Sequence, residues 1–213
     1  MIELKGPEIC NSRNKSSLIV CLHGWGSSGD NFIHLAKIMS KSLPDSCFIA
    51  PNAPFKREDN GYQWFSLEDR SEDVLYHGVK NAALIINHFV DMKLKKLNLN
   101  DGQLSFIGFS QGAMLAIHAS LVRPQSCASV VAYSGRFLSP SRVSQEIRSR
   151  PNMCIIHGDA DNIVHFSFFN LAVKFLRKNG VNVESHKIHA LGHIINEEGI
   201  KIGVEFIKRN LGC

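Results

Sequence analysis

The chain has 213 residues, of which 44% are hydrophobic and 20% are charged, a composition that fits one globular domain over residues 1–213 and excludes a disordered chain. The formal net charge is +5, but Lys and Arg are scattered among Asp and Glu, so no basic stripe indicates a nucleic-acid partner. No run approaches the roughly 18 apolar residues of a membrane span, and the N-terminus has no secretory signal, so we expect no integral membrane contact.

Short apolar segments rich in β-branched residues alternate with longer helical patterns. The predicted strands are residues 18–22, 47–50, 104–108, 129–133, 153–157 and 181–188, and the predicted helices are residues 30–42, 71–95, 111–122, 141–148, 166–179 and 194–210. Near-continuous apolar runs such as LIVCL and SVVAY are typical of parallel strands buried on both faces. The alternation therefore predicts an α/β domain with a mostly parallel central sheet and helices on both faces.

The loop after the first of these strands, residues 22–29, reads LHGWGSSG. Its glycines let the backbone approach a bound molecule closely, and a loop after an early strand is one place from which the backbone N–H donors of an acyl-transfer site come. The N–H of Trp25 is the candidate, because this residue follows His-Gly. The alternative is an ordinary glycine-rich turn in which Ser27 or Asp30 caps the next helix.

Residues 51–70 form a polar segment without clean periodicity that carries Trp64 and Phe65. Loops of this length inside compact domains are often functional, although a surface excursion with two aromatic side chains tucked under it fits equally well. Trp64 and Phe65 are therefore candidates for the lining of a substrate pocket, together with Met114 and Phe137. Each of the four fits a core position as readily.

Residues 108–112 read GFSQG, the only complete GxSxG in the chain. They follow the strand pattern LSFIG and open the helix pattern QGAMLAIHASLV, which is the setting of a nucleophile elbow. Gly108 and Gly112 remove side chains that would collide in such a tight turn. Ser110 is the candidate nucleophile, and the N–H of Gln111, at a helix N-terminus, is placed to stabilise an oxyanion. The alternative is a plain Gly-Ser turn.

A serine nucleophile needs a base and an acid that orients the base, and in this setting the chain order is Ser, acid, His. Asp159 and Asp161 both follow the strand predicted over residues 153–157, and the residues alone do not separate them. His193 lies in a glycine-marked turn before the last helix and is the candidate base. The spacing of His186, His189 and His193 also fits a cluster of metal ligands. No HExxH motif accompanies these histidines, so we expect no metal.

The six cysteines form no CxxC pair. Four of them lie in or beside apolar runs, where a free thiol packs as a small hydrophobic side chain. A disulfide framework is a poor fit for a chain of this length. We therefore expect reduced thiols and a cytoplasmic protein.

With these segments in place, the chain resembles the carboxylesterase/phospholipase family of α/β-hydrolases, which includes the acyl-protein thioesterases. The matching stretches are LHGWGSSGDNF, PNAP, YQWFSL, GFSQGAMLA, YSGRF, HGDADNIV and GHIINEEG, in the family order and across nearly the whole chain. The resemblance implies an α/β-hydrolase fold and a triad of Ser110, Asp161 and His193. It also implies oxyanion donors on the backbones of Trp25 and Gln111, and neither a metal nor an organic cofactor.

Four positions depart from the usual family pattern and bear on the shape of the acyl pocket: Trp25, Ser66, Arg136 and Asn162. The sequence predicts hydrolysis of a small acyl ester or thioester through an acyl-enzyme, as in a carboxylesterase, acyl-protein thioesterase or lysophospholipase. One alternative is a non-catalytic binding protein on a hydrolase fold. Another is a peripheral lipid-handling protein that touches membranes through the basic residues 93–96, although these also suit a solvated helix end. A homodimer is left open.

Overall fold

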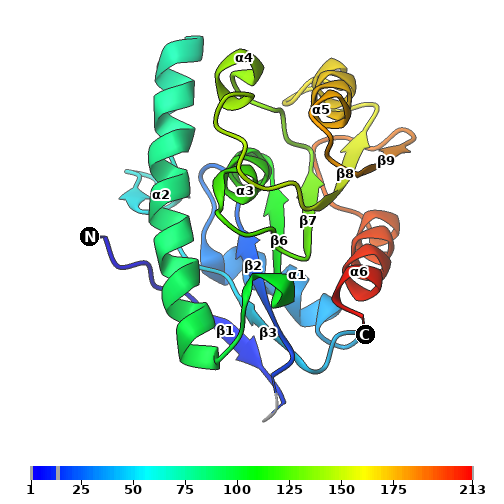
Figure 1. Cartoon of the computed structure of the whole chain (residues 1–213). Coiled ribbons are helices and arrows are strands. Elements are labelled where there is room, and N and C mark those ends of the chain that lie inside the picture. The colour runs from blue at the N-terminus through cyan, green and yellow to red at the C-terminus, as the bar shows by residue number, and fades with distance from the viewer. Residues whose placement is uncertain (1, 13–14, 213) are drawn as a thin grey trace.

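A seven-stranded sheet forms the centre of the computed structural model, which describes residues 2–12 and 15–212 (Figure 1). The strand order is β1-β3-β2-β6-β7-β8-β9, and β1 at the edge runs antiparallel to β3 while the remaining neighbours are parallel. The strands are β1 (Glu8–Cys10), β2 (Ser17–Leu22), β3 (Ser46–Ile49), β6 (Leu104–Phe109), β7 (Ser129–Tyr133), β8 (Asn152–Gly158) and β9 (Val183–Ile188). The predicted mostly parallel sheet is confirmed.

Helices cover both faces of this sheet, as predicted (Figure 1). They are α1 (Gly29–Met39), α2 (Glu72–Leu97), α3 (Gln111–Val122), α4 (Pro140–Val143), α5 (Ser167–Lys178) and α6 (Glu197–Leu211). On β2, Leu18 and Val20 join the apolar cluster beneath α2, α3 and α5, whereas Ile19 and Cys21 join the cluster beneath α1 and α6. Alternate side chains of a strand point to opposite faces, so the apolar run in β2 supplies two cores.

Several elements differ from the prediction because they depend on distant partners. The three-residue β1 and the hairpin of β4 (Phe55–Lys56) and β5 (Tyr62–Gln63) were not expected. Helix α4 is shorter than the predicted helix, and α6 begins at Glu197 because the Asn196 side chain caps it by accepting the N–H of Gly199. Ser28, rather than Ser27 or Asp30, caps α1.

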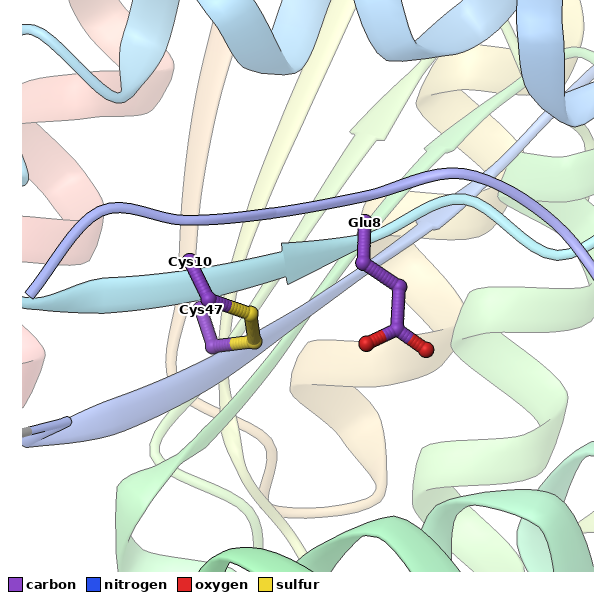
Figure 2. Close-up of side chains that lie close together, drawn as sticks. All are labelled: Glu8, Cys10 and Cys47. Atoms are coloured by element: carbon purple, nitrogen blue, oxygen red, sulfur yellow. A yellow bond between two sulfur atoms is a disulfide. The ribbon is translucent and has the colours of Figure 1, made fainter. Parts of the chain in front are cut away.

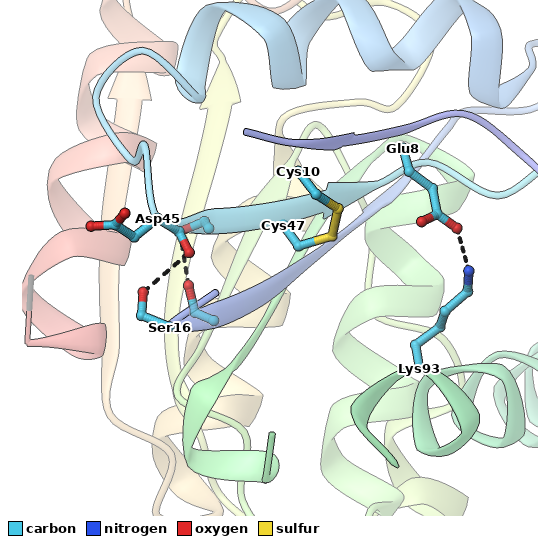
Figure 3. The surroundings of a disulfide bond; sticks show 8 residues. Glu8, Cys10, Ser16, Asp45, Cys47 and Lys93 are labelled. Atoms are coloured by element: carbon cyan, nitrogen blue, oxygen red, sulfur yellow. Dashed lines mark hydrogen bonds and ion pairs between the residues drawn. A yellow bond between two sulfur atoms is a disulfide. The ribbon is translucent and has the colours of Figure 1, made fainter. Parts of the chain in front are cut away.

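The expectation of reduced thiols is wrong for one pair of cysteines. Cys10 on β1 and Cys47 on β3 stand opposite each other in the antiparallel register and form a disulfide (Figures 2 and 3). No local pattern indicates this pair, because the two thiols become neighbours only when β1 pairs with β3. Cys21, Cys127 and Cys154 are free and buried, as expected of small hydrophobic side chains.

One lysine of the basic end of α2 is paired within the fold. Lys93 pairs with Glu8 on β1 (Figure 3), and Lys95 and Lys96 occupy the last turn, where the helix dipole favours cations. Among residues 2–12 and 15–212, no helix is both long and apolar enough to cross a bilayer.

Candidate active site

Ser110 stands in the sharp turn between β6 and α3. Its backbone adopts φ 54° and ψ −116°, a conformation rarely populated by residues with a side chain. A Cβ on Gly108 would lie 2.3 Å from the carbonyl oxygen of Gly112, and a Cβ on Gly112 would lie 2.0 Å from that of Leu22. The two glycines of the motif are therefore required by the packing of this turn, and the N–H of Ser110 is fixed by a 2.9 Å hydrogen bond to the carbonyl of Tyr133.

A continuous chain of hydrogen bonds joins Ser110, His193 and Asp161. Nε2 of His193 lies 3.0 Å from Oγ of Ser110, and Nδ1 of His193 lies 2.7 Å from Oδ2 of Asp161. Because an ionised carboxylate can only accept, Nδ1 carries the proton and donates a hydrogen bond to Asp161. Nε2 is then free to accept the hydroxyl proton of Ser110, which is the arrangement a general base requires.

Asp161 is held ionised by its surroundings. Its Oδ1 accepts the N–H groups of Ile163 and Val164, each at 2.9 Å, while Oδ2 faces His193. Burial raises the pKa of Asp161, but the hydrogen bonds from His193, Val164 and Ile163 outweigh it and hold the pKa below the ordinary value for aspartate. His157 supports the same loop, donating from Nε2 to the Val164 carbonyl at 2.8 Å with Oδ2 of Asp161 only 3.3 Å away.

Asp159 serves a different segment. Its Oδ1 accepts the N–H of Ala190 at 2.7 Å, and its Oδ2 lies 3.2 Å from Nδ1 of His189 and 3.6 Å from Nζ of Lys187. The hydrogen bonds from His189 and Ala190 lower the pKa of this partly exposed carboxyl. Asp159 thus braces the turn after β9, and only Asp161 of the two carboxylates contacts His193.

The three histidines considered for a metal do not converge. Each contacts a different carboxylate: His186 that of Glu184, His189 that of Asp159 and His193 that of Asp161. A separate group of potential ligands, Cys154 with Glu184 and His186, lies on β8 and β9 away from the cleft. Its Glu184 is already shared between His186 and Arg209.

Two residues that line the cleft beside Ser110, Trp25 and Gln111, have backbone N–H groups with no acceptor among the described residues. Gln111 is the first residue of α3, so its N–H has no acceptor within the helix. In the loop after β2, the N–H of Gly26 donates to Tyr62 and that of Ser27 to Gly24, whereas the N–H of Trp25 finds no acceptor among the residues described. His23 anchors this loop, with Nε2 accepting the N–H of Ala53 at 3.0 Å.

The position of Trp64 and Phe65 corrects the expectation that they line the pocket. Their exposed fractions are 0% and 2%, and neither side chain reaches the cleft. The side-chain amide of Gln111 holds this segment: its Oε1 accepts the N–H of Trp64 at 2.9 Å, and its Nε2 donates to the carbonyl of Phe65 at 2.7 Å. The indole N–H of Trp64 in turn donates to the His23 carbonyl at 2.9 Å. The two aromatics therefore connect the loops that carry the candidate oxyanion donors.

A cleft of about 850 Å³ opens above Ser110 and His193, and Met114 contributes to its wall. A second cavity of about 560 Å³ adjoins it and is lined by Phe137. Met114 thus lies in the cleft, where substrate contact was expected, whereas Phe137 lines only the adjoining cavity.

Sequence reasoning missed several residues at the site. His157, the side-chain amide of Gln111 and the arginines of the segment 51–70 were not assigned. One signal was present, because His157 is four residues before Asp161 at the end of the same strand. The amide of Gln111 left no signal, since its partners are 46 and 47 residues away.

Comparison with known proteins identifies the family and the fold. The phospholipase/carboxylesterase family model matches residues 5–211. The chain is 26% identical to acyl-protein thioesterase 1 homolog 1 of Dictyostelium discoideum, over 92% of this chain and 91% of that protein. It is 28% identical to carboxylesterase SOBER1 of Arabidopsis thaliana, again over 92% and 91%. The crystal structure of esterase PE8 superposes with a TM-score of 0.92 at 32% identity, covering 98% of this chain and 99% of that one. The protein has the α/β-hydrolase fold, and the chain belongs to the phospholipase/carboxylesterase family.

Proposed function

We propose that the protein hydrolyses carboxylic esters or thioesters through a covalent acyl-enzyme on Ser110. The observation that carries this proposal is the unbroken hydrogen-bond chain from Asp161 through His193 to Ser110, at the base of an open cleft. Names of related proteins, acyl-protein thioesterase and carboxylesterase, support the same reaction class.

The reaction has two halves. In the first, Oγ of Ser110 attacks the acyl carbonyl while Nε2 of His193 takes its proton, and His193 then protonates the departing alcohol or thiol. In the second, His193 removes a proton from water, and the hydroxide attacks the acyl-enzyme and releases the acid. Asp161 keeps the proton of the imidazole on Nδ1 and stabilises the imidazolium in both halves.

The tetrahedral intermediates carry an oxyanion that needs donors already in position. The N–H groups of Trp25 and Gln111 supply them, each contributing on the order of 3 kcal/mol to the transition state. The helix dipole of α3 adds to the contribution of Gln111. The chemistry requires no metal or organic cofactor.

Covalent labelling tests the proposal directly. A fluorophosphonate probe should label the wild-type protein once, on Ser110, and should not label Ser110→Ala. Turnover of p-nitrophenyl esters of increasing chain length, beside an acyl-thioester, then defines the acyl preference. A folded protein that resists the probe and hydrolyses none of these substrates would instead be a binding protein on a hydrolase fold.

The redox state of Cys10 and Cys47 in the cell indicates the compartment in which the protein acts. The cytosol keeps thiols reduced, so a cytoplasmic location requires this pair to be reduced in the cell, whereas an oxidising compartment preserves it. Rapid alkylation of the protein in cell lysates, followed by mass spectrometry of the Cys10 and Cys47 peptides, distinguishes the two.

A further inference from the structure

Two arginines stand at the boundary between the catalytic cleft and the adjoining cavity. Arg70 and Arg136 line both spaces, and the cleft they line is the one that contains Ser110 and His193. Arg70 comes from the segment before α2, and Arg136 comes from the loop after β7. Two segments far apart in the sequence thus bring guanidinium groups to one wall of the site.

Neither guanidinium has an ion-pair partner among residues 2–12 and 15–212. Nε of Arg70 makes a long, 3.4 Å contact with the carbonyl of Leu67, and Arg136 lies over the ring of Phe168 at 5.3 Å. The third arginine of the cleft, Arg57, differs, because it pairs with Asp59 and stacks on Trp25. Among the described residues, the two boundary arginines are therefore the arginines of the cleft without a carboxylate partner.

The surroundings of Arg136 favour the approach of an anion. Arg136 is half-buried, and burial together with the neighbouring charge of Arg70 lowers its pKa, although a guanidinium remains charged in a protein. Five cationic side chains line the two cavities against two carboxylates, those of Glu68 and Glu72, which are both exposed. A half-buried charge beside a like charge is favourable only when an opposite charge joins it.

We propose that Arg70 and Arg136 form an anion-binding subsite, so that the substrate is an ester or thioester that carries a carboxylate or phosphate group away from the bond that is cleaved. This inference rests on the proposed function and specifies its substrate class. A planar guanidinium fork donates two parallel hydrogen bonds to such an oxyanion, while the reacting carbonyl lies at Ser110.

Matched pairs of substrates test the proposal. In the first arm the charge is on the acyl side: the mono-p-nitrophenyl esters of glutaric and sebacic acid are compared with the same esters capped by a methyl group. In the second arm the charge is on the leaving group. The carboxylate pair is 3-butanoyloxy-4-nitrobenzoate and its methyl ester. The phosphate pair is the butanoate ester of a nitrophenol that bears a phosphate monoester, and the same compound with the phosphate as a neutral triester. The ratio of kcat/KM for charged and neutral partners isolates the anion, and the arms identify which part of the substrate carries it.

We expect the charged-to-neutral ratio of kcat/KM to exceed 10 for the wild type in at least one arm. In Arg136→Met and in Arg70→Gln this ratio should fall by roughly 10- to 100-fold, because that is the range for the loss of a hydrogen bond to a charged group. Arg136→Lys should be intermediate, because it retains the charge without the fork. Lys96→Gln is the matched control: it removes one positive charge at the other end of α2, a 26-residue helix about 39 Å long, and should leave the ratio unaltered. Raising ionic strength should lower the wild-type ratio.

A direct binding measurement keeps this inference separate from the reaction. Calorimetry with Ser110→Ala should show tighter binding of the charged esters, and loss of that preference when Arg70→Gln is added. Wild-type protein that hydrolyses neutral esters as well as or better than their charged partners in both arms would overturn the subsite and leave the proposed function standing. Preferential binding of the charged esters without any hydrolysis would overturn the proposed function and leave the subsite standing. Arg70 is exposed, so Arg70→Gln should fold even if Arg136→Met does not.

Discussion

Replacement of Asp161 by asparagine should inactivate the protein for a reason that can be read from its contacts. Oδ1 of Asp161 accepts two backbone N–H groups at 2.9 Å, and Oδ2 faces Nδ1 of His193 at 2.7 Å. In Asp161→Asn only the amide oxygen can occupy the Oδ1 position, since an NH₂ there would oppose two donors. The NH₂ must then face His193, whose Nδ1 becomes an acceptor. The proton of the imidazole moves to Nε2, which can no longer accept from Ser110.

We expect kcat to fall by about 10⁴, or roughly 5 kcal/mol in the activation barrier. Asp159→Asn is the matched control, because it makes the same chemical change two residues away at a carboxylate that braces Ala190 and His189. Loss of that brace should cost at most about 10- to 100-fold, the scale of a slightly misplaced loop.

Both variants should be assayed on one soluble p-nitrophenyl ester, with circular dichroism and thermal melts to show that each is folded. A folded Asp161→Asn with near-normal turnover would refute the tautomer argument. If Asp159→Asn were the crippled variant, the acid of the triad would be wrong while Ser110 and His193 could stand.

Further outcomes follow from the site and from the core. Ser110→Ala should lower kcat by on the order of 10⁶ with an unchanged melting temperature; ordinary turnover by that variant would exclude the serine mechanism. EDTA should not change turnover, because His186, His189 and His193 contact separate carboxylates; loss of activity that zinc restores would contradict this. Cys10→Ser should lower the free energy of unfolding by about 3 to 4 kcal/mol, the loop-entropy value for a 37-residue separation, and dithiothreitol should destabilise the wild type but not the variant. His118 in α3 is buried with both ring nitrogens unpaired among the described residues, and burial lowers its pKa to about 4. Between pH 6.5 and 4 the unfolded chain therefore binds a proton that the folded chain does not, and stability should fall with falling pH by up to about 3 kcal/mol. Denaturant titrations should show a shallower acid loss in His118→Leu, and an identical slope would contradict the assignment.

The parts of the fold predicted from sequence are those whose signal is local. The strand β2 and the elbow at Ser110 each lie within a few consecutive residues, where an apolar run or two glycines determine the backbone. The strand β1 has only three residues, and what fixes it is its pairing with β3. The Cys10–Cys47 disulfide was missed for the same reason, since it forms only across that pairing.

The same distinction between local signals and distant partners applies to the candidate site. Asp159 and Asp161 share one loop, and no pattern in the residues separates them. The turn directs Asp159 to the segment after β9 and Asp161 to His193. Trp64 and Phe65 could have faced the cleft or the core, and the choice depends on the amide of Gln111, which holds their backbone from a distant helix.

The proposed catalytic residues and the proposed anion subsite lie on different parts of this fold. Trp25, Ser110, Asp161 and His193 each follow a parallel strand, namely β2, β6, β8 and β9. The carboxyl ends of parallel strands meet at one edge of the sheet, so the order of the motifs along the chain predicted that these loops assemble, while the choice of Asp161 rested on the family resemblance. Arg70 belongs to a long segment between β5 and α2 and reaches the cleft only because that segment folds over it. Because neither Arg70 nor Arg136 bonds to the hydrogen-bond chain of Ser110, the charge of the wall can change while that chain remains. Substrate class is therefore the property of this protein that a motif search is least able to predict, and the one that the charged and neutral ester pairs measure.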